Sequence, residues 1–334
     1  MAWSRARRTH DVAGGIMVDF RYHLVSLISV FIALALGVVL GAGPLQAPIA
    51  SGLTSQVEQL REAQSKTTEE IEISRADVAK RNEWIHSMTE QILPGTLDGR
   101  HVAILTFDET RGEDIEAIRD YIETAGGVVN QRITLEPGWY ESDLSQFRTS
   151  LSGPIAGHLT NQQGEDASAA AILSHALLEV ITTTSDNSAL LREMLSDPEN
   201  PLVTYSQDAT TSEAIVIIGA PAPTTDTSEM PAEPQETPAD ESAAIDKNML
   251  SQLASVMALA PSSAVVVGET SFDNGLVTIV RADNIQVTTI DSVGTAMANA
   301  SVVLALPTAK AERRSFGYAG TADSPLPPLP QNKE

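Results

Sequence analysis

The residues that could do chemistry at a catalytic or metal site are carboxylates that follow two expected strands. Asp108 and Glu109 come directly after the strand expected at Arg100–Phe107, and Asp291 ends a later one at Ile285–Asp291. α/β enzymes often place catalytic or Mg²⁺-binding carboxylates at such strand ends. A local interpretation competes with this one: Thr110, with Glu113 three residues later, would form a capping box for the next helix. We favour capping over metal binding.

Other side chains with reactive or metal-binding chemistry are scattered along the chain. Cysteine is absent, which excludes disulfides, thiolate ligands and cysteine nucleophiles. No G-x-S-x-G, P-loop, H-E-x-x-H or G-x-G-x-x-G pattern occurs, so we predict a non-enzymatic protein without a resident cofactor, and an enzyme using Asp108 and Asp291 is the weakest alternative. Met249 and Met257 form no cluster, and no high-affinity copper site is visible. The histidines are dispersed as His10, His23, His86, His101, His158 and His175.

The charge balance narrows the range of partners. The 334 residues include 44 acidic and 21 basic side chains, which gives a formal net charge of −23. Such an acidic chain is not expected to bind nucleic acid or an anionic lipid surface as its main partner.

One uncharged segment, residues 24–43, is long enough to cross a membrane at about 1.5 Å per residue. The arginines Arg5, Arg7, Arg8 and Arg21 precede it, and the next basic residue is Arg61. The positive-inside rule therefore predicts a cytoplasmic N-terminus, residues 1–23, and an extracytoplasmic location for the rest. A cleaved signal peptide is the alternative, but proline lies close to each small-residue cleavage position. We favour a permanent single-pass anchor.

Small residues recur every four positions within the span, at Ser29, Ala33, Gly37 and Gly41. On a helix this spacing places them on one face, where they let a second helix approach closely. Association between copies is one interpretation. The other is that small residues are simply frequent in membrane helices.

The chain then changes to a heptad pattern over residues 51–93. The surrounding residues are rich in Glu, Gln, Lys and Arg, which indicates a long helix with coiled-coil character. Two interpretations remain open: pairing with a second copy or another coiled-coil protein, or a single helix packed on its own domain. The apolar positions of the seam are Leu53, Val57, Leu60, Ile71, Val78, Ile85, Met88 and Ile92, and its polar positions include Gln64, Thr67, Ser74 and Arg81.

Residues 98–320 alternate strand and helix patterns, which predicts an α/β domain with a largely parallel sheet. Expected strands include Arg100–Phe107, Val128–Leu135, Ala214–Gly219 and Ser263–Glu269. Residues 220–243 are acidic and rich in proline, so we predict a disordered insertion at the carboxyl edge of the sheet. The tail, residues 321–334, is expected to be flexible, and its "PLPPLP" could be a polyproline II ligand.

Several segments together carry a resemblance to a known family. They are "DFRYHLVSL" and "ALALGVVLGAG" near the N-terminus, "LPGTLDGRHVAIL", "YIETAGGVVNQRITL", "TTIDSVGTAMANASVVLAL" and "FGYAG". In this order they resemble the MctB family of actinobacterial copper transport proteins. The resemblance covers most of residues 17–320, and family proteins tend to start where Met17 lies. It implies an envelope location, in some accounts in the outer membrane, and a role in copper ion transport or copper homeostasis.

The same resemblance extends to corynebacterial proteins of daughter-cell separation, with a cytoplasmic partner and peptidoglycan hydrolases outside. It supplies no ligand or catalytic residue. The chain lacks the ten-residue alternation of a membrane barrel. We therefore expect a membrane-anchored copper-homeostasis protein first, and a non-enzymatic coiled-coil scaffold for cell-wall separation second.

Overall fold

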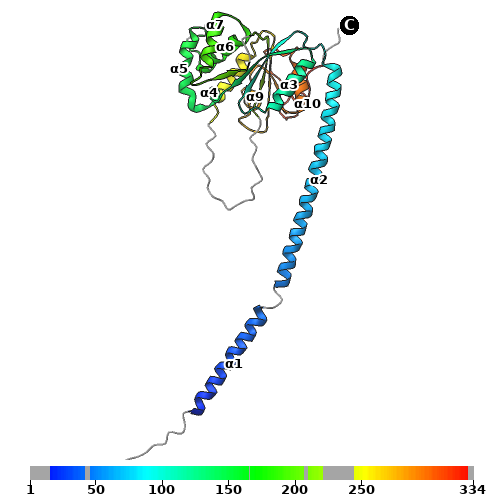
Figure 1. Ribbon diagram of the computed structural model, residues 1–334, viewed down its shortest axis with the longest axis vertical. Coiled ribbons are helices and arrows are strands. Elements are labelled where there is room, and N and C mark those ends of the chain that lie inside the picture. The colour runs from blue at the N-terminus through cyan, green and yellow to red at the C-terminus, as the bar shows by residue number, and fades with distance from the viewer. Residues whose placement is uncertain (1–15, 42–45, 165, 207–209, 221–243, 330–334) are drawn as a thin grey trace, which may run out of the picture. The chain divides into compact units, whose positions relative to one another are not determined.

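The computed structural model describes residues 16–41, 46–164, 166–206, 210–220 and 244–329. The chain divides into two units, Met1–Val78 and Ala79–Glu334. The first contains helix α1 and most of helix α2, and the second is an α/β domain (Figure 1).

Helix α1 spans Ile16–Gly41 and contains a segment, Arg21–Val39, that is long and apolar enough to cross a membrane, with a mean hydropathy of 2.3. The expected span of residues 24–43 extends beyond Gly41 into residues outside the described part. One polar side chain of the span is satisfied within the helix, because the Ser29 hydroxyl donates to the Val25 carbonyl at 2.8 Å. This bond lowers the cost of placing a hydroxyl in hydrocarbon.

Helix α2 spans Gln46–Ile92 and is 47 residues long. It begins five residues before the expected position 51, and Pro48 is tolerated because the first turn of a helix needs no backbone N–H partners. It ends before Pro94, and Gly95 takes a positive φ of 81° that suits a helix exit.

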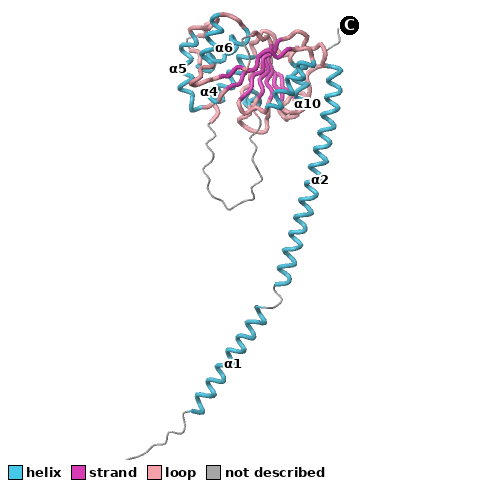
Figure 2. The backbone as a smooth tube through the Cα atoms, in the orientation of Figure 1, coloured by secondary structure: helices cyan, strands magenta, loops and turns pink. Residues whose placement is uncertain are grey.

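The domain is built on a central sheet, drawn in magenta in Figure 2. The sheet has seven strands in the order β3-β2-β1-β4-β5-β6-β7. Every neighbouring pair is parallel except β2 with β3. The central strands are buried on both faces, which explains their continuous apolar runs. The strands are β1 (His101–Phe107), β2 (Val128–Leu135), β3 (Val203–Tyr205), β4 (Ala214–Ile218), β5 (Ser263–Val267), β6 (Thr288–Ile290) and β7 (Arg314–Phe316).

Helices cover both faces of this sheet, as expected for an α/β domain (Figure 1). One face packs against α4 (Pro137–Tyr140), α5 (Ser145–Ala156), α6 (Ala169–Thr182), α7 (Asp186–Leu195), α8 (Lys247–Met257) and α9 (Leu276–Ala282). The other packs against α3 (Gly112–Thr124) and α10 (Ala296–Ala305). Leu93 and Leu97, which follow α2, are fully buried in this second core.

Some short elements have no counterpart in the sequence prediction. They are α4, the 3₁₀ turn Ser142–Leu144, α5, α9, β3 and β7. The two edge strands have three residues each, too few to show a period-two pattern.

Two segments expected to be disordered or flexible border well-bonded residues. Residues 221–243 of the acidic insertion lie outside the described part, but the residue that follows them is held in place, since the Ser142 N–H donates to the Ala244 carbonyl at 2.7 Å. The tail begins with residues bonded to β7: the Gly317 N–H donates to the Ser324 carbonyl, and the Ser315 N–H to the Asp323 carboxylate. Residues 330–334 are outside the described part.

Candidate functional site

The carboxyl edge of the sheet is the first place to look for a site, because open α/β sheets bind ligands where the strand order reverses. Here that point lies between β1 and β4, which are neighbours in the sheet. Asp108 and Glu109 follow β1, and Gly219 follows β4 just before the acidic insertion.

Asp108 is exposed, and its carboxylate accepts a hydrogen bond from the Tyr140 hydroxyl at 2.5 Å. The Tyr140 ring lies edge-on to Phe107 with centroids 5.4 Å apart. Burial of the ring and the bond to Asp108 raise the pKa of Tyr140 above its usual value, so this hydroxyl keeps its proton. Asp108 therefore attaches α4 to the end of β1.

The capping box expected at Thr110 is wrong. The N-cap of α3 is Arg111, and no side chain caps the helix. The Thr110 hydroxyl instead accepts from the Phe107 N–H at 3.0 Å and donates to the Ile218 carbonyl at 3.4 Å. The Thr110 hydroxyl therefore joins the turn after β1 to β4, and it is not available to cap α3. Glu113 and Asp114 do lie in the first turn of α3, where their charge suits the helix dipole.

Asp291 occupies a different environment at the end of β6, where it is 1% exposed. Its carboxylate pairs with the Arg281 guanidinium at 3.0 Å and accepts the backbone N–H groups of Tyr318 at 2.7 Å and Ala319 at 3.2 Å. The Ser292 hydroxyl donates a further bond at 2.8 Å. These donors satisfy both oxygens, so the carboxylate holds the loop after β7 rather than presenting free ligand atoms.

Arg281 connects this carboxylate to the surrounding strands. It also donates to the Thr289 hydroxyl, the Thr321 hydroxyl and the Phe316 carbonyl. Every part of the pair is thus hydrogen-bonded, which is the condition under which a buried ion pair is tolerated.

Gly317 lets the loop come this close to Asp291. Its φ is 132°, and a Cβ built on it would lie 2.0 Å from Asp291 Oδ1. The "FGYAG" segment, noted in the sequence only as part of a resemblance, therefore forms the backbone cradle of this carboxylate.

Asp108 and Asp291 belong to separate networks, with no hydrogen bond or ion pair joining them in the described part of the chain. Glu269 follows β5, and its pKa is raised by burial and by the charges of Asp114 and Asp291, whereas the charge of Arg111 lowers it. Within the described ranges, no three His, Asp or Glu side chains are grouped so that they could hold a metal ion.

The histidine and methionine side chains noted in the sequence lie in different environments. His101 is exposed at the start of β1, whereas Met249 and Met257 are buried in the core. His86 on α2 packs against the Tyr121 ring, with Nδ1 3.4 Å from the hydroxyl. His23 lies in α1, His158 is half-buried after α5, and His10 is outside the described residues.

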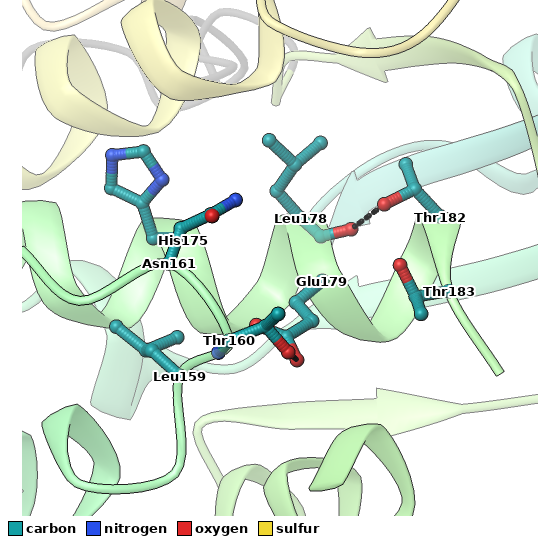
Figure 3. Close-up of a pocket in the computed structure, with 8 residues that line it drawn as sticks. All are labelled: Leu159, Thr160, Asn161, His175, Leu178, Glu179, Thr182 and Thr183. Carbon is teal, nitrogen blue, oxygen red and sulfur yellow. Dashed lines mark hydrogen bonds between the residues drawn. The ribbon is translucent and has the colours of Figure 1, made fainter. Parts of the chain in front are cut away.

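A small cavity of about 150 Å³ that the sequence did not indicate lies between α6 and the loop before it (Figure 3). Thr160 donates both its N–H and its hydroxyl to the Glu179 carboxylate, at 2.9 and 2.6 Å. The His175 ring and the Asn161 side chain point to the same side of α6, away from Glu179 (Figure 3). Burial lowers the pKa of His175, which favours its neutral form. The donors diverge and do not form a metal cage.

The apolar residues of the heptad seam of α2 are exposed over most of the helix. Residues 56–81 are all exposed. The seam residues Val57, Leu60, Ile71, Val78, Met88 and Ile92 are between 37% and 69% exposed, Ile85 is half-buried, and the side chain of Leu53 is outside the described part.

The last turns of α2 differ, since they contact the α/β domain. Thr89 is 4% exposed, and His86 packs against Tyr121 of α3. Packing on its own domain, one of the two interpretations of the heptads, therefore describes this end of the helix. For the seam from Val57 to Val78, both interpretations remain open.

The small-residue face of α1 is exposed as well. Ser29, Ala33, Gly37 and Gly41 are all accessible, and a Cβ added at Gly37 or Gly41 would meet nothing within 4 Å. Contacts within the described part of the chain therefore do not require glycine at these two positions.

Comparison with known proteins identifies a family and several relatives. A family model described as "Copper transport outer membrane protein, MctB" matches residues 17–327. The copper transporter MctB of Mycobacterium tuberculosis is 28% identical over 135 residues, and that of Mycobacterium leprae is 24% identical over 135 residues. Each match covers 40% of this chain and 43% of the relative, so it spans less than half of the curated proteins.

Proposed function

The chain belongs to the MctB family, and on that basis we propose that it is an envelope protein that acts in copper ion transport or copper homeostasis. The observation that supports this role is the family match over residues 17–327, which includes α1, α2 and the whole sheet. The relatives that are named copper transporters support it further.

We propose a single-pass topology for this role. Arg21 begins the apolar segment, Arg5, Arg7 and Arg8 precede it, and Arg61 is the next basic residue, so the N-terminus stays in the cytoplasm. The α/β domain then lies outside the cell membrane, with an outer-envelope location as the alternative that the family description suggests. Copper is a transported or buffered ion here, and the chain works within an assembly.

A gene deletion tests this function. Loss of the protein should change copper sensitivity and the copper content of the cell, and re-expression of the full chain should restore both. Zinc sensitivity is the control, because a general envelope defect would change the sensitivity to both metals. Unchanged copper sensitivity and copper content in the deletion strain would exclude the proposed role.

A second candidate function is a non-enzymatic scaffold that connects the membrane to cell-wall separation. The exposed seam of α2 favours it, because a row of apolar residues at heptad spacing is suited to bind another helix. The partners would be a second copy or another coiled-coil protein, with a cytoplasmic protein and a peptidoglycan hydrolase in the same pathway.

Charged substitutions in the seam test the scaffold. Leu60→Glu with Ile71→Glu should abolish helix pairing and impair cell separation, because charges would replace the exposed apolar seam. Ile73→Glu is the matched control: Ile73 is an isoleucine on the same helix, 63% exposed, but off the seam. Normal cell separation in the double variant would refute the scaffold.

A further inference from the structure

We propose that α2 pairs with α2 of a second copy of this chain, parallel and in register, over Val57–Val78. This inference rests on the proposed scaffold function and names its first partner. It also fixes the direction of the two helices.

The seam that would be covered consists of exposed residues. Leu60 is 69% exposed and Ile71 is 45% exposed, and each lies at a position that inserts into a facing helix in a coiled coil. Between them the seam is polar, with Gln64 and Thr67. A polar residue at such a position selects register at a cost in stability, because it is satisfied only when it faces a matching polar group. In register, Gln64 faces its own copy.

The charges beside the seam choose the direction. With Val57, Gln64, Ile71 and Val78 as a positions, the charged residues at g are Glu70 and Asp77, and those at e are Arg61 and Arg75. The remaining g and e positions, Ala63 and Thr68, are uncharged. In a parallel pair, g of one helix faces e of the next heptad on the other, so Glu70 faces Arg75 of the second copy.

An antiparallel pair would place e opposite e and g opposite g. The arginines would then face arginines and the acidic residues would face acidic residues, which is destabilising. The charge pattern therefore supports only the parallel direction.

The membrane anchor gives the same direction independently. Two copies inserted by α1 enter from the same side, so their α2 helices leave the membrane in the same sense. The open face at Gly37 and Gly41 lets two α1 helices approach closely below them. At the other end, Arg81 would face its own copy in the seam, so the pairing is limited to the stretch before it.

Cysteine crosslinking of the full-length chain in its own membrane tests the pairing. The chain has no cysteine, so a single substitution provides the only thiol. Thr67→Cys and Ser74→Cys both lie in the seam, where equivalent residues of a parallel pair come within disulfide distance. Ser65→Cys and Ala76→Cys lie on the outer face of the same helix and are the matched controls. Diamide serves as the oxidant.

The expected result is a covalent dimer for each seam variant and monomer for each control on a non-reducing gel. Monomer for both seam variants, or equal dimer yields for all four variants, overturns the pairing. An antiparallel pair places d positions opposite a positions, so Thr67→Cys would crosslink to Ile71→Cys in a mixture while Thr67→Cys and Ser74→Cys would each stay monomeric alone, and that result would overturn the parallel direction.

Charge reversal provides a second measurement that does not depend on crosslinking. Glu70→Arg should weaken dimerisation in detergent by roughly tenfold, since two attractive pairs become repulsive. Adding Arg75→Glu should restore it, and Glu69→Arg, on the outer face, should have no effect. No loss with Glu70→Arg, or no recovery in the double variant, overturns the predicted register.

These readouts are separate from those of the proposed function. If no dimer forms but deletion still changes copper handling, the pairing fails and the copper role stands. If the dimer forms but Leu60→Glu with Ile71→Glu leaves cell separation normal, the scaffold function fails and the pairing stands.

Discussion

Replacing Asp291 by asparagine should destabilise the α/β domain far more than the same change at Asp108. Asp291 is 1% exposed and Arg281 is 8% exposed, so the substitution leaves a buried guanidinium without its counter-charge. Breaking a buried pair by removing one partner typically costs about 3–5 kcal/mol. In addition, the asparagine amide nitrogen must face N–H donors that now bind the carboxylate, either those of Arg281 and Ala319 at one oxygen or that of Tyr318 at the other.

We therefore expect Asp291→Asn to lower the free energy of unfolding by about 3–5 kcal/mol. For a domain of this size, the midpoint of thermal unfolding should fall by roughly 6–20 °C. Asp108→Asn should cost about 1 kcal/mol or less, because Asp108 is exposed and accepts one bond, from Tyr140.

The assay is urea unfolding of the full-length chain in detergent, followed by the fluorescence of Trp139, which is fully buried. Trp3→Phe and Trp84→Phe in every variant leave this tryptophan as the only reporter. Adding Arg281→Met to Asp291→Asn should recover part of the loss, since the unpaired charge is removed. A loss below about 1 kcal/mol, or equal losses for Asp291→Asn and Asp108→Asn, would refute the structural role of this carboxylate.

Three more predictions concern the α/β domain and copper binding by the chain. Gly317→Ala should destabilise the domain by at least about 2 kcal/mol, because the added Cβ would overlap Asp291. Gly320→Ala is the control and should be near neutral, because nothing lies within 4 Å of its added Cβ. Urea unfolding measures both variants, and equal effects would contradict the close contact between Gly317 and Asp291. Burial raises the pKa of Glu269 from 4.5, so its contribution to stability is fully present below about pH 4.5 and is lost as pH rises through the folded-state pKa. Glu269→Gln should therefore stabilise the chain at neutral pH and flatten this part of the stability profile, measured by unfolding across acidic to neutral pH; a profile identical to that of the wild type would contradict this. Calorimetric titration of the full chain with Cu(II), and with Cu(I) under anaerobic conditions, should give weak binding that excess Mg²⁺ removes and that His175→Ala leaves unchanged, because the donors diverge. Saturable binding in excess Mg²⁺ would contradict it.

The order of helices and strands in the domain could be predicted from the sequence because it depends on local periodicity. Ile115, Ile118 and Ile122 repeat at helical spacing, and they form the buried face of α3. The run from Val102 to Phe107 is buried on both faces of β1, as its unbroken apolar sequence indicates. Each of these patterns needs only neighbours in the chain to be recognised.

The hydrogen-bond partners of the polar residues could not be predicted in this way. Thr110 and Glu113 have the spacing of a capping box, yet the Thr110 hydroxyl bonds to Ile218, which is distant in sequence and adjacent only because β1 pairs with β4. A capping pattern describes one helix end, and it contains no information about a competing partner from another strand.

By itself, the sequence determined an apolar helix long enough to span a membrane, a long heptad helix and a largely parallel α/β domain, since each follows from composition and spacing along the chain. Only the tertiary structure decided between the two carboxylates that the sequence presents alike. Asp108 stays exposed at the end of β1, whereas Asp291 is buried because β7 lies beside β6 and brings the Gly317–Ala319 backbone onto it. Burial and satisfaction of a charge depend on which strands become neighbours, and that order is a property of the whole sheet.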